Sequence, residues 1–393
     1  MKKLAIISSH PIQYNAPLFA LMAKNGLFEL KVFYTWGEES IKPKYDPDFG
    51  REVEWDIPLL NGYQFQFVKN FAKNPGSHHF FGIDNPDLIQ DIESWGAHVV
   101  WVWGWSFKSH LKAIRHFYGE IPVWFRGDST LLDDSISPIW KQLLRKIFLS
   151  WVYKKVDLTF YVGENNKNYF LQHGLIPSKL IHAPHAIDNR RFSDWNVGLQ
   201  NDLTAWKESL GIAEDNLVVL FVGKLEPKKN PKFMLDLAAR LPSQKFKFLI
   251  IGDGVLGDEL KQKTKDDNRI LFLPFQNQTK MPSVYRLGDL LVLPSLGPGE
   301  TWGLAMNEAM ACGIPVFGSS KCGGSIDLID HSCGLIFDPS DLNTVVNQLN
   351  ILADNPDGLA NLKAGAIKKI QHFRYEKIVD AVVEGIHRID RAN

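Results

Sequence analysis

The feature that most constrains the fold of this chain is the regular alternation of short apolar runs with helical patterns. In the first half, apolar runs predict strands at residues 4–7, 30–34, 98–103, 123–125, 158–162 and 180–182. Helical patterns lie between them at residues 16–24, 86–95, 108–118, 138–155 and 165–173. Because parallel strands need long crossovers, usually helices, this alternation predicts an α/β fold with a mostly parallel sheet covered on both faces.

The second half repeats the pattern, so the chain contains two such units. Its apolar runs predict strands that begin at Leu217, Phe246, Ile270, Leu290, Val316 and Leu335. A chain of 393 residues is also too long for one ordinary core. The boundary is expected near residues 190–201, where Asp, Asn, Gly and Gln crowd the sequence. We therefore predict one domain over residues 1–190 and another over residues 191–372.

Composition excludes several classes of partner. Lys and Arg number 44, as do Asp and Glu, so we expect no nucleic-acid partner. The three cysteines, Cys312, Cys322 and Cys333, have no metal-ligand spacing and leave one thiol unpaired in any disulfide scheme. This usage favours free thiols in a reducing cytoplasm. No apolar run approaches the roughly 20 residues that span a bilayer.

The run PSLGPGETWGLAMNEAM, residues 294–310, carries two glutamates with seven residues between them. Glu300 lies in a Gly/Pro-rich loop after a predicted strand, and Glu308 lies in a helix predicted over residues 303–311. The start of such a helix presents backbone N–H groups that bind anions. These groups belong to Thr301, Trp302, Gly303 and Leu304. The run suits a ligand with both phosphate and hydroxyl groups, and the alternative is two solvated glutamates.

A basic turn follows another predicted strand. The apolar run 217–222 stops at Gly223 and continues as KLEPKKNP, in which Asn230 is expected to cap a helix that starts at Pro231. Lys224 and Lys229 flank this crossing, which is where open α/β sheets bind ligands. We expect this turn to be exposed to solvent. The two ammonium groups would then be able to neutralise a diphosphate. The alternative is a lysine-rich turn that is only solvated.

Two other motifs point less clearly to chemistry. Residues 252–257, GDGVLG, match the dinucleotide fingerprint G-x-G-x-x-G, but the acid expected about 20 residues later is absent. A turn beside another nucleotide explains Gly252 equally well. Asp46 and Asp48 have D-x-D spacing, but they lie beside Lys44 in a loop of the first half, where we expect a solvated turn. His78-His79 could ligate a metal, but no nearby Cys or acidic residue completes a site. We expect no metal.

Together these runs resemble the retaining glycosyltransferases of family 4, which have the GT-B fold. The specific part is the E-x7-E run closed by EAMACGIPV, and the basic pair in GKLEPKKNP stands where the family has Arg and Lys. The runs IIGDGV at 250–255 and APHAIDNRRF at 183–192 resemble two further signatures. The resemblance covers about residues 156–340. It implies two Rossmann-like, doubly wound parallel-sheet domains facing across a cleft, with residues 373–393 crossing back to the first.

The resemblance also implies a function and a role for each residue. Residues 1–190 would bind the acceptor, a glycan or lipid-linked glycan, and residues 191–372 the nucleotide diphosphate sugar, with no other cofactor. Lys224 and Lys229 would hold the diphosphate, Glu300 the donor sugar and Glu308 the ribose. Gly223, Gly252 and Phe275 would border the nucleotide. The alternatives are a sugar-nucleotide epimerase or hydrolase of the same fold, and a non-catalytic nucleotide- or glycan-binding module.

The first half departs from the family pattern in two places. The loop after the first strand has none of the glycines that many relatives carry, so His10 and Tyr14 are expected to line the cleft. The alternative is that His10 only caps a turn. Where relatives often have a histidine near the transferred sugar, this chain has Arg126 and Asp128.

The helix predicted over residues 138–155 is basic and amphipathic. One side carries Ile139, Leu143, Leu144, Ile147, Phe148 and Trp151, and five basic residues lie mostly off it. We expect the apolar side to pack on the sheet of its own domain. The alternative is contact with an anionic membrane surface, which would place the protein on the inner face of the membrane.

Overall fold

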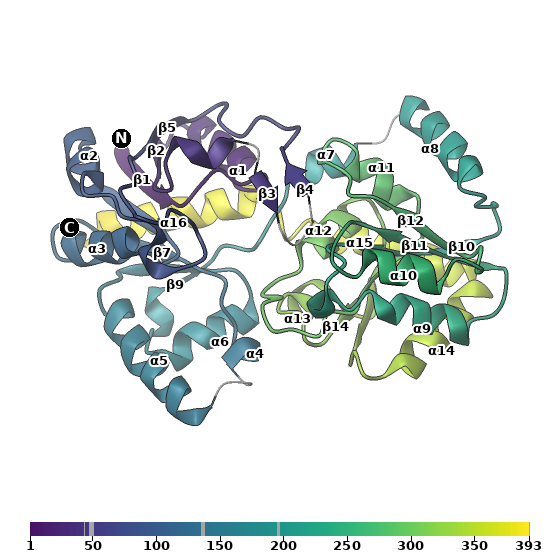
Figure 1. Ribbon diagram of the computed structural model, residues 1–393. Coiled ribbons are helices and arrows are strands. Elements are labelled where there is room, and N and C mark those ends of the chain that lie inside the picture. The colour runs from purple at the N-terminus through teal and green to yellow at the C-terminus, as the bar shows by residue number, and fades with distance from the viewer. Residues whose placement is uncertain (43, 47–50, 135–137, 195–196, 393) are drawn as a thin grey trace. The chain divides into compact units, whose positions relative to one another are not determined.

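The computed structural model describes all residues except 43, 47–50, 135–137, 195–196 and 393. The chain forms two compact units, and Figure 1 labels many of their helices and strands. The first contains Met1–Lys42, Pro58–His185 and Tyr375–Asn393, and the second contains Pro43–Ile57 and Ala186–Arg374. Within the described residues, no helix has both the length and the hydrophobicity needed to cross a membrane.

The first unit is built on a parallel sheet of seven described strands. Their order is β5 (Gln64–Phe67), β2 (Phe28–Tyr34), β1 (Lys2–Ser8), β6 (Val99–Trp103), β7 (Val123–Arg126), β8 (Leu158–Tyr161) and β9 (Leu180–His182). In register, Leu4 pairs with Leu30 on one side and with Val99 on the other. The chain order reverses between β1 and β6, so the loops after these strands diverge at this point of the sheet.

Helices cover both faces of this sheet. They are α1 (Ala16–Lys24), α2 (Leu88–Trp95), α3 (Lys108–Phe117), α4 (Leu131–Asp134), α5 (Ile139–Tyr153), α6 (Glu164–Gln172) and α16 (Tyr375–Ala392), with short 3-10 turns η1 (Glu38–Ile41), η2 (Phe80–Gly82) and η3 (Pro177–Lys179). Val100 and Phe125 share one core cluster with α2, α3, α5 and α6. On the other face α16 approaches so closely that a Cβ on Gly385 would lie 2.9 Å from the Trp124 ring.

The second unit is built on a parallel sheet of six described strands. Their order is β12 (Ile270–Leu273), β11 (Phe246–Ile251), β10 (Leu217–Val222), β13 (Leu290–Leu293), β14 (Val316–Ser319) and β15 (Gly334–Phe337). An antiparallel pair, β3 (Lys44–Asp46) and β4 (Arg51–Val53), belongs to the same unit. The chain order reverses between β10 and β13, two strands that pair directly, with Val219 opposite Leu290.

The helices of the second unit follow the strands in alternation. They are α7 (Asn189–Ser193), α8 (Val197–Ser209), α9 (Lys232–Arg240), α10 (Gly257–Lys263), α11 (Met281–Arg286), α12 (Leu304–Ala311), α13 (Ser325–Leu328), α14 (Leu342–Ala353) and α15 (Pro356–Ile370), with a 3-10 turn η4 (Pro227–Lys229). One core cluster joins Val219, Phe248 and Val292 of the strands to side chains of α9 and α14. The predicted fold class of two Rossmann-like, doubly wound parallel sheets is therefore confirmed.

Two local predictions are wrong. Asn230 does not cap a helix: it has φ 55°, in the left-handed region, and Pro231 is the cap of α9. The η4 turn ends at Asn230, and Asn tolerates this conformation better than most residues. The expected packing of the apolar side of α5 is also wrong, because Leu149, Val152 and Tyr153 are its buried side chains. The six predicted packing residues are exposed.

The C-terminal helix α16 clusters with the first unit. The Tyr375 hydroxyl donates to the Tyr14 carbonyl at 2.8 Å, and the Arg388 guanidinium donates to the Ser178 carbonyl at 2.8 Å. Arg374, the residue just before α16, pairs with Ile187 in an isolated parallel β-bridge and belongs to the second unit. The chain thus leaves the first unit after His185 and returns to it at Tyr375.

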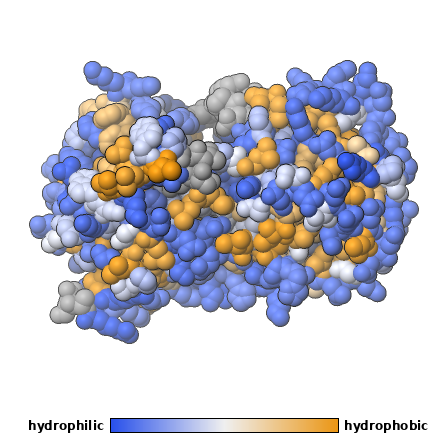
Figure 2. Space-filling view, turned by 90° about the horizontal axis from the view of Figure 1, so that it is seen from below, coloured by the Kyte–Doolittle hydropathy of each residue, from blue (hydrophilic) through white to orange (hydrophobic). Residues whose placement is uncertain are grey.

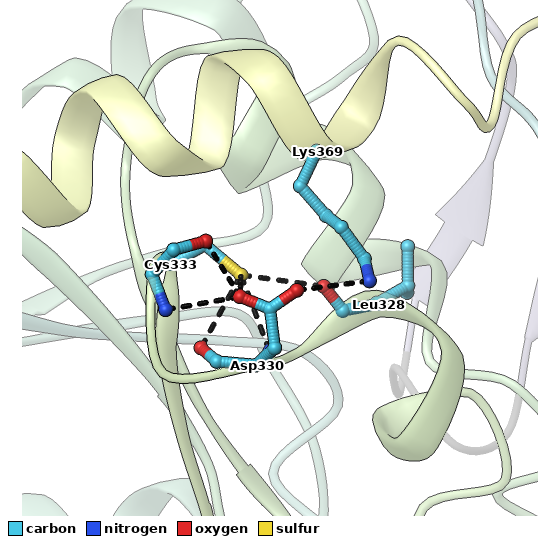
Figure 3. A network of polar contacts seen from close by, with 5 residues as sticks. Leu328, Asp330, Cys333 and Lys369 are labelled. Carbon is cyan, nitrogen blue, oxygen red and sulfur yellow. Dashed lines mark hydrogen bonds and ion pairs between the residues drawn. The ribbon is translucent and has the colours of Figure 1, made fainter.

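A polar turn fixes α15 to the sheet of the second unit (Figure 3). The Lys369 ammonium of α15 lies 3.1 Å from the Asp330 carboxylate, and the Cys333 thiol donates to the Leu328 carbonyl. Hydrogen bonds from Ser332 and the charge of Lys369 lower the pKa of Asp330. Burial raises the pKa of the Cys333 thiol, so this cysteine is a poor nucleophile with a structural place in the turn.

Candidate active site

The two runs that the sequence singles out leave neighbouring strands of the second unit. The loop after β10 carries Gly223, Lys224 and η4, and the loop after β13 carries Glu300. These strands flank the point at which the chain order reverses. In open α/β sheets, ligands bind outside the carboxyl ends of the strands at this point. The topology therefore places both runs where a ligand site is expected.

Lys229 and Glu300 form an ion pair across these two loops. The Glu300 carboxylate also accepts a hydrogen bond from the Ser295 hydroxyl at 3.2 Å. The Lys229 side chain is 19% exposed and that of Glu300 is 7% exposed. The expectation that Lys229 lies in an exposed turn is therefore wrong, because the lysine folds inward to compensate a buried carboxylate.

Main-chain hydrogen bonds hold three loops together around this pair. The Leu296 amide donates to the Lys228 carbonyl at 2.8 Å, which joins the loop after β13 to η4. The Gly323 amide donates to the Glu300 carbonyl at 2.9 Å, which joins the same loop to the one after β14. Glu300 is thus positioned through both its main chain and its carboxylate.

The start of α12 is fixed by close packing. Gly303 has φ 89°, and a Cβ there would lie 2.6 Å from the Cys322 sulfur, so a larger residue would be excluded. The Trp302 ring is buried, and its Nε1 donates to the Asn307 side chain at 2.8 Å. Only the main chain of Trp302 can therefore contribute to a site at the helix start. The first amides of an α-helix generally have no acceptor within the helix, which suits an anion, although in α12 the Met306 amide donates to the Gly303 carbonyl at 2.9 Å.

Glu308 lies on α12, with its carboxylate held by a residue of another helix. The Tyr285 hydroxyl of α11 donates to Glu308 Oε2 at 2.7 Å. Burial raises the pKa of Glu308 to about 7, although Tyr285 and the charge of Arg191 act in the opposite direction. Sequence analysis missed Tyr285, because a tyrosine in a short helix carries no signal of its own.

Close packing of the backbone explains why glycine is needed in the G-x-G-x-x-G run. A Cβ on Gly252 would lie 2.0 Å from the Gly223 carbonyl oxygen, so the loops after β10 and β11 touch through their backbones. The Asp253 carboxylate of this run accepts from the Phe275 amide at 3.1 Å. The Phe275 ring lies 6.4 Å from that of Trp55, a second residue that sequence analysis missed. These aromatic rings and glycines border the loops after β11 and β12.

Residues predicted near the acceptor come together in the first unit, with one addition. Arg126 is buried and donates to the carbonyls of Ala183, at 2.8 Å, and Pro184, at 3.2 Å. The next residue, His185, lies 3.7 Å from the Asp128 carboxylate. Burial lowers the pKa of Arg126 to about 10 and also lowers that of His185.

Tyr14 joins this group, whereas His10 contacts other residues. The Tyr14 ring lies 6.5 Å from that of His185, and burial together with the Asp128 charge raises the Tyr14 pKa to about 12. His10 has its Nδ1 atom 2.9 Å from the Ser9 hydroxyl and its ring against Trp36. Sequence analysis quoted His185 within residues 183–192 but did not single it out.

The metal motifs do not assemble into a site in the described part of the chain. Among the described residues, no group of three or more His, Cys, Asp or Glu side chains could hold a metal ion. The His79 ring lies 3.1 Å from the Asn74 carbonyl. Asp48 lies outside the described residues. Metal independence stays a prediction.

Comparison with known proteins identifies the domain that carries the site. Residues 202–369 match the family model described as glycosyl transferases group 1. This segment, which contains the candidate site, is therefore similar to group 1 glycosyltransferase domains. The D-inositol 3-phosphate glycosyltransferase of Rhodococcus opacus is 31% identical over 196 residues, which cover 47% of this chain and 43% of that protein. The chain thus spans less than half the length of this relative.

Two solved structures share the fold over nearly the whole chain. The Anabaena protein HepE, in complex with UDP and glucose, superposes with a TM-score of 0.71 at 17% identity, covering 99% of this chain and all of that one. A glycosyltransferase from Rickettsia africae gives a TM-score of 0.74 at 12% identity, covering 100% and 99%. At these identities the likeness shows the fold alone, that of GT-B proteins.

Proposed function

We propose that this protein is a retaining glycosyltransferase of family 4 that moves a sugar from a nucleotide diphosphate sugar to a glycan or lipid-linked glycan acceptor. The observation that carries the proposal is the Lys229–Glu300 ion pair at the strand-order reversal of a domain similar to group 1 glycosyltransferase domains. It is supported by HepE, which binds UDP and glucose in the same fold.

The diphosphate is assigned to the basic turn and the start of α12. When the bond from the anomeric carbon to the phosphate oxygen breaks, negative charge develops on the departing diphosphate. Lys224, Lys229 and the amides of residues 301–304 stabilise this charge without needing a divalent ion. When the Lys229 ammonium moves from Glu300 to the diphosphate, a carboxylate oxygen of Glu300 becomes available to accept a hydrogen bond from a hydroxyl of the donor sugar.

The nucleoside is assigned to the surrounding loops. Glu308, oriented by Tyr285, accepts hydrogen bonds from the ribose hydroxyls. Phe275 and Trp55 present apolar rings to the base. Gly223 and Gly252 keep side chains out of the space beside the diphosphate, where their backbones already touch.

The acceptor is assigned to the first unit. His10 and Tyr14 follow β1, which borders the order reversal, and Arg126 and Asp128 lie at the end of β7, the strand next to β6. His185 follows β9 at the edge of the sheet and contacts Asp128 and the Tyr14 ring. In a retaining reaction the acceptor hydroxyl bonds to the same face of the anomeric carbon that the diphosphate leaves. We place the reaction in the cytoplasm, because all three cysteines are free thiols, as is usual in a reducing compartment. We further propose that the product belongs to a cell-surface polysaccharide or glycoconjugate.

A donor-turnover assay tests this proposal. The protein is incubated with a panel of nucleotide sugars, with and without glycan acceptors, and products are resolved by NMR. Acceptor-dependent transfer with an unchanged anomeric configuration supports it. Donor loss without acceptor indicates an epimerase or hydrolase, inversion refutes retention, and binding without turnover indicates a non-catalytic module.

A further inference from the structure

Helix α5 of the first unit presents an apolar face to solvent. Seven large hydrophobic side chains on this helix are exposed, from 37% for Phe148 to 84% for Ile139: Ile139, Trp140, Leu143, Leu144, Ile147, Phe148 and Trp151. We call these seven residues the α5 face. In Figure 1, α5 lies at the lower left of the first unit. Figure 2 views the protein from below and shows apolar surface on that left side.

The α5 face lies opposite the side that anchors the helix. Trp140, Leu144, Ile147 and Trp151 recur every three or four residues, so they form one stripe along α5. Leu149, Val152 and Tyr153 fall on the other side and are buried in the core of the first unit. A helix fixed by one apolar side and exposing a second has a surface that folding of its own unit does not cover.

Positive charge borders the α5 face. Residues 139–155 contain Lys141, Arg145, Lys146, Lys154 and Lys155 and no acidic residue. Lys141 lies over the Trp140 ring at 5.4 Å, and Lys155 lies 5.8 Å from the Trp151 ring. Arg115 of α3 also lies over Trp151, at 5.6 Å. Aromatic and basic side chains in this mixture match the headgroup region of an anionic bilayer.

We propose that the α5 face docks on an anionic lipid bilayer, with its tryptophans and aliphatic side chains in the headgroup boundary and its basic residues against lipid phosphates. Each basic residue near such a surface contributes about 1 kcal/mol, and burial of the apolar side chains adds to this. Two copies joined through this face would instead bring together basic borders with no acid on either helix. Charge complementarity therefore favours lipid over a second copy.

Vesicle sedimentation with the full chain tests the proposal independently of any transfer activity. The probes are vesicles of phosphatidylcholine alone and of phosphatidylcholine mixed with phosphatidylglycerol. The apolar variant carries Trp140→Gln, Leu143→Gln and Ile147→Gln, and the charge variant carries Lys141→Gln, Lys146→Gln and Lys154→Gln. Ile351→Gln with Ile367→Gln is a matched control, because both isoleucines are exposed on helices of the second unit.

The wild type and the control should bind mixed vesicles and bind phosphatidylcholine far less. The charge variant should lose about a hundredfold in partition coefficient, at roughly 1 kcal/mol for each lysine. The apolar variant should lose at least about tenfold while keeping its melting temperature, since exposed side chains hold little of the fold. Equal binding by all variants, or no binding by the wild type, would overturn the proposal. A wild-type dimer that the apolar variant abolishes, without vesicle binding, would assign the face to a second copy.

Discussion

Replacing Lys229 by Ala should weaken both the fold of the second unit and its affinity for a nucleotide diphosphate. The substitution removes the charge partner of Glu300, which is 7% exposed and keeps the Ser295 hydroxyl as a donor. An unpaired, fully buried charge costs about 3–5 kcal/mol. Because Lys229 is 19% exposed, water can reach part of this site, and we expect about 2 kcal/mol. For a unit of this size the melting temperature should fall by about 4–8 °C.

The same substitution should weaken binding of UDP by about 1.5–3 kcal/mol, or 10- to 150-fold, because a charge-assisted contact is lost. Differential scanning fluorimetry and titration calorimetry measure the two effects. The double variant with Glu300→Gln should recover the melting temperature, since no charge is left buried, but not the affinity. Lys232→Ala is the matched control, because its ion pair with Glu259 is exposed and should matter little. An unchanged melting temperature and affinity in Lys229→Ala, or recovered affinity in the double variant, would refute the reasoning.

Three further predictions concern the carboxylates and the metal. Glu300→Gln should chiefly lower kcat, and Glu308→Gln should chiefly raise KM for the donor, because the ribose is bound alike before and after transfer; steady-state kinetics that reverse this order would refute the assignment. The folded-state pKa of Glu308 is about 7 against an ordinary 4.5, so its ionisation reduces stability as pH rises from about 4.5 to about 7. Glu308→Gln should therefore melt higher than wild type at pH 8 but not at pH 4, and an equal difference at both would contradict the pKa. Activity should survive EDTA, and loss that manganese or magnesium restores would show that a metal supplies the positive charge.

The fold was predictable because the periodicity of apolar residues and the length of each apolar run indicate strands and helices. Buried parallel strands such as Leu217–Val222 and Leu290–Leu293 are continuous apolar runs, and the helix over Ala16–Lys24 is predicted with its observed bounds. The strand β5, Gln64–Phe67, was missed because it alternates polar and aromatic residues and is short. The grouping of residues 43–57 with the second unit was missed because contacts such as Asn277 to the Glu54 carbonyl have no local signature.

The candidate site was predictable where it depends on motifs and not where it depends on packing. The E-x7-E run and the basic turn identify Glu300 and Lys229, but their ion pair follows from the adjacency of β10 and β13. Likewise, Tyr285 reaches Glu308 from a different helix. The exposed side of α5 was misjudged because both of its sides are apolar, and the sequence alone does not say which side faces the sheet.

The central claim is that the loops after β10 and β13, with the start of α12, bind the diphosphate of a nucleotide sugar. Hydrogen–deuterium exchange of the full protein with and without UDP tests it most directly, since it reports which amides the ligand protects. We predict slower exchange at residues 223–230 and 296–305, and loss of this protection in Lys229→Ala at the same UDP concentration. Protection confined to other segments, or none at saturating UDP, would contradict the account.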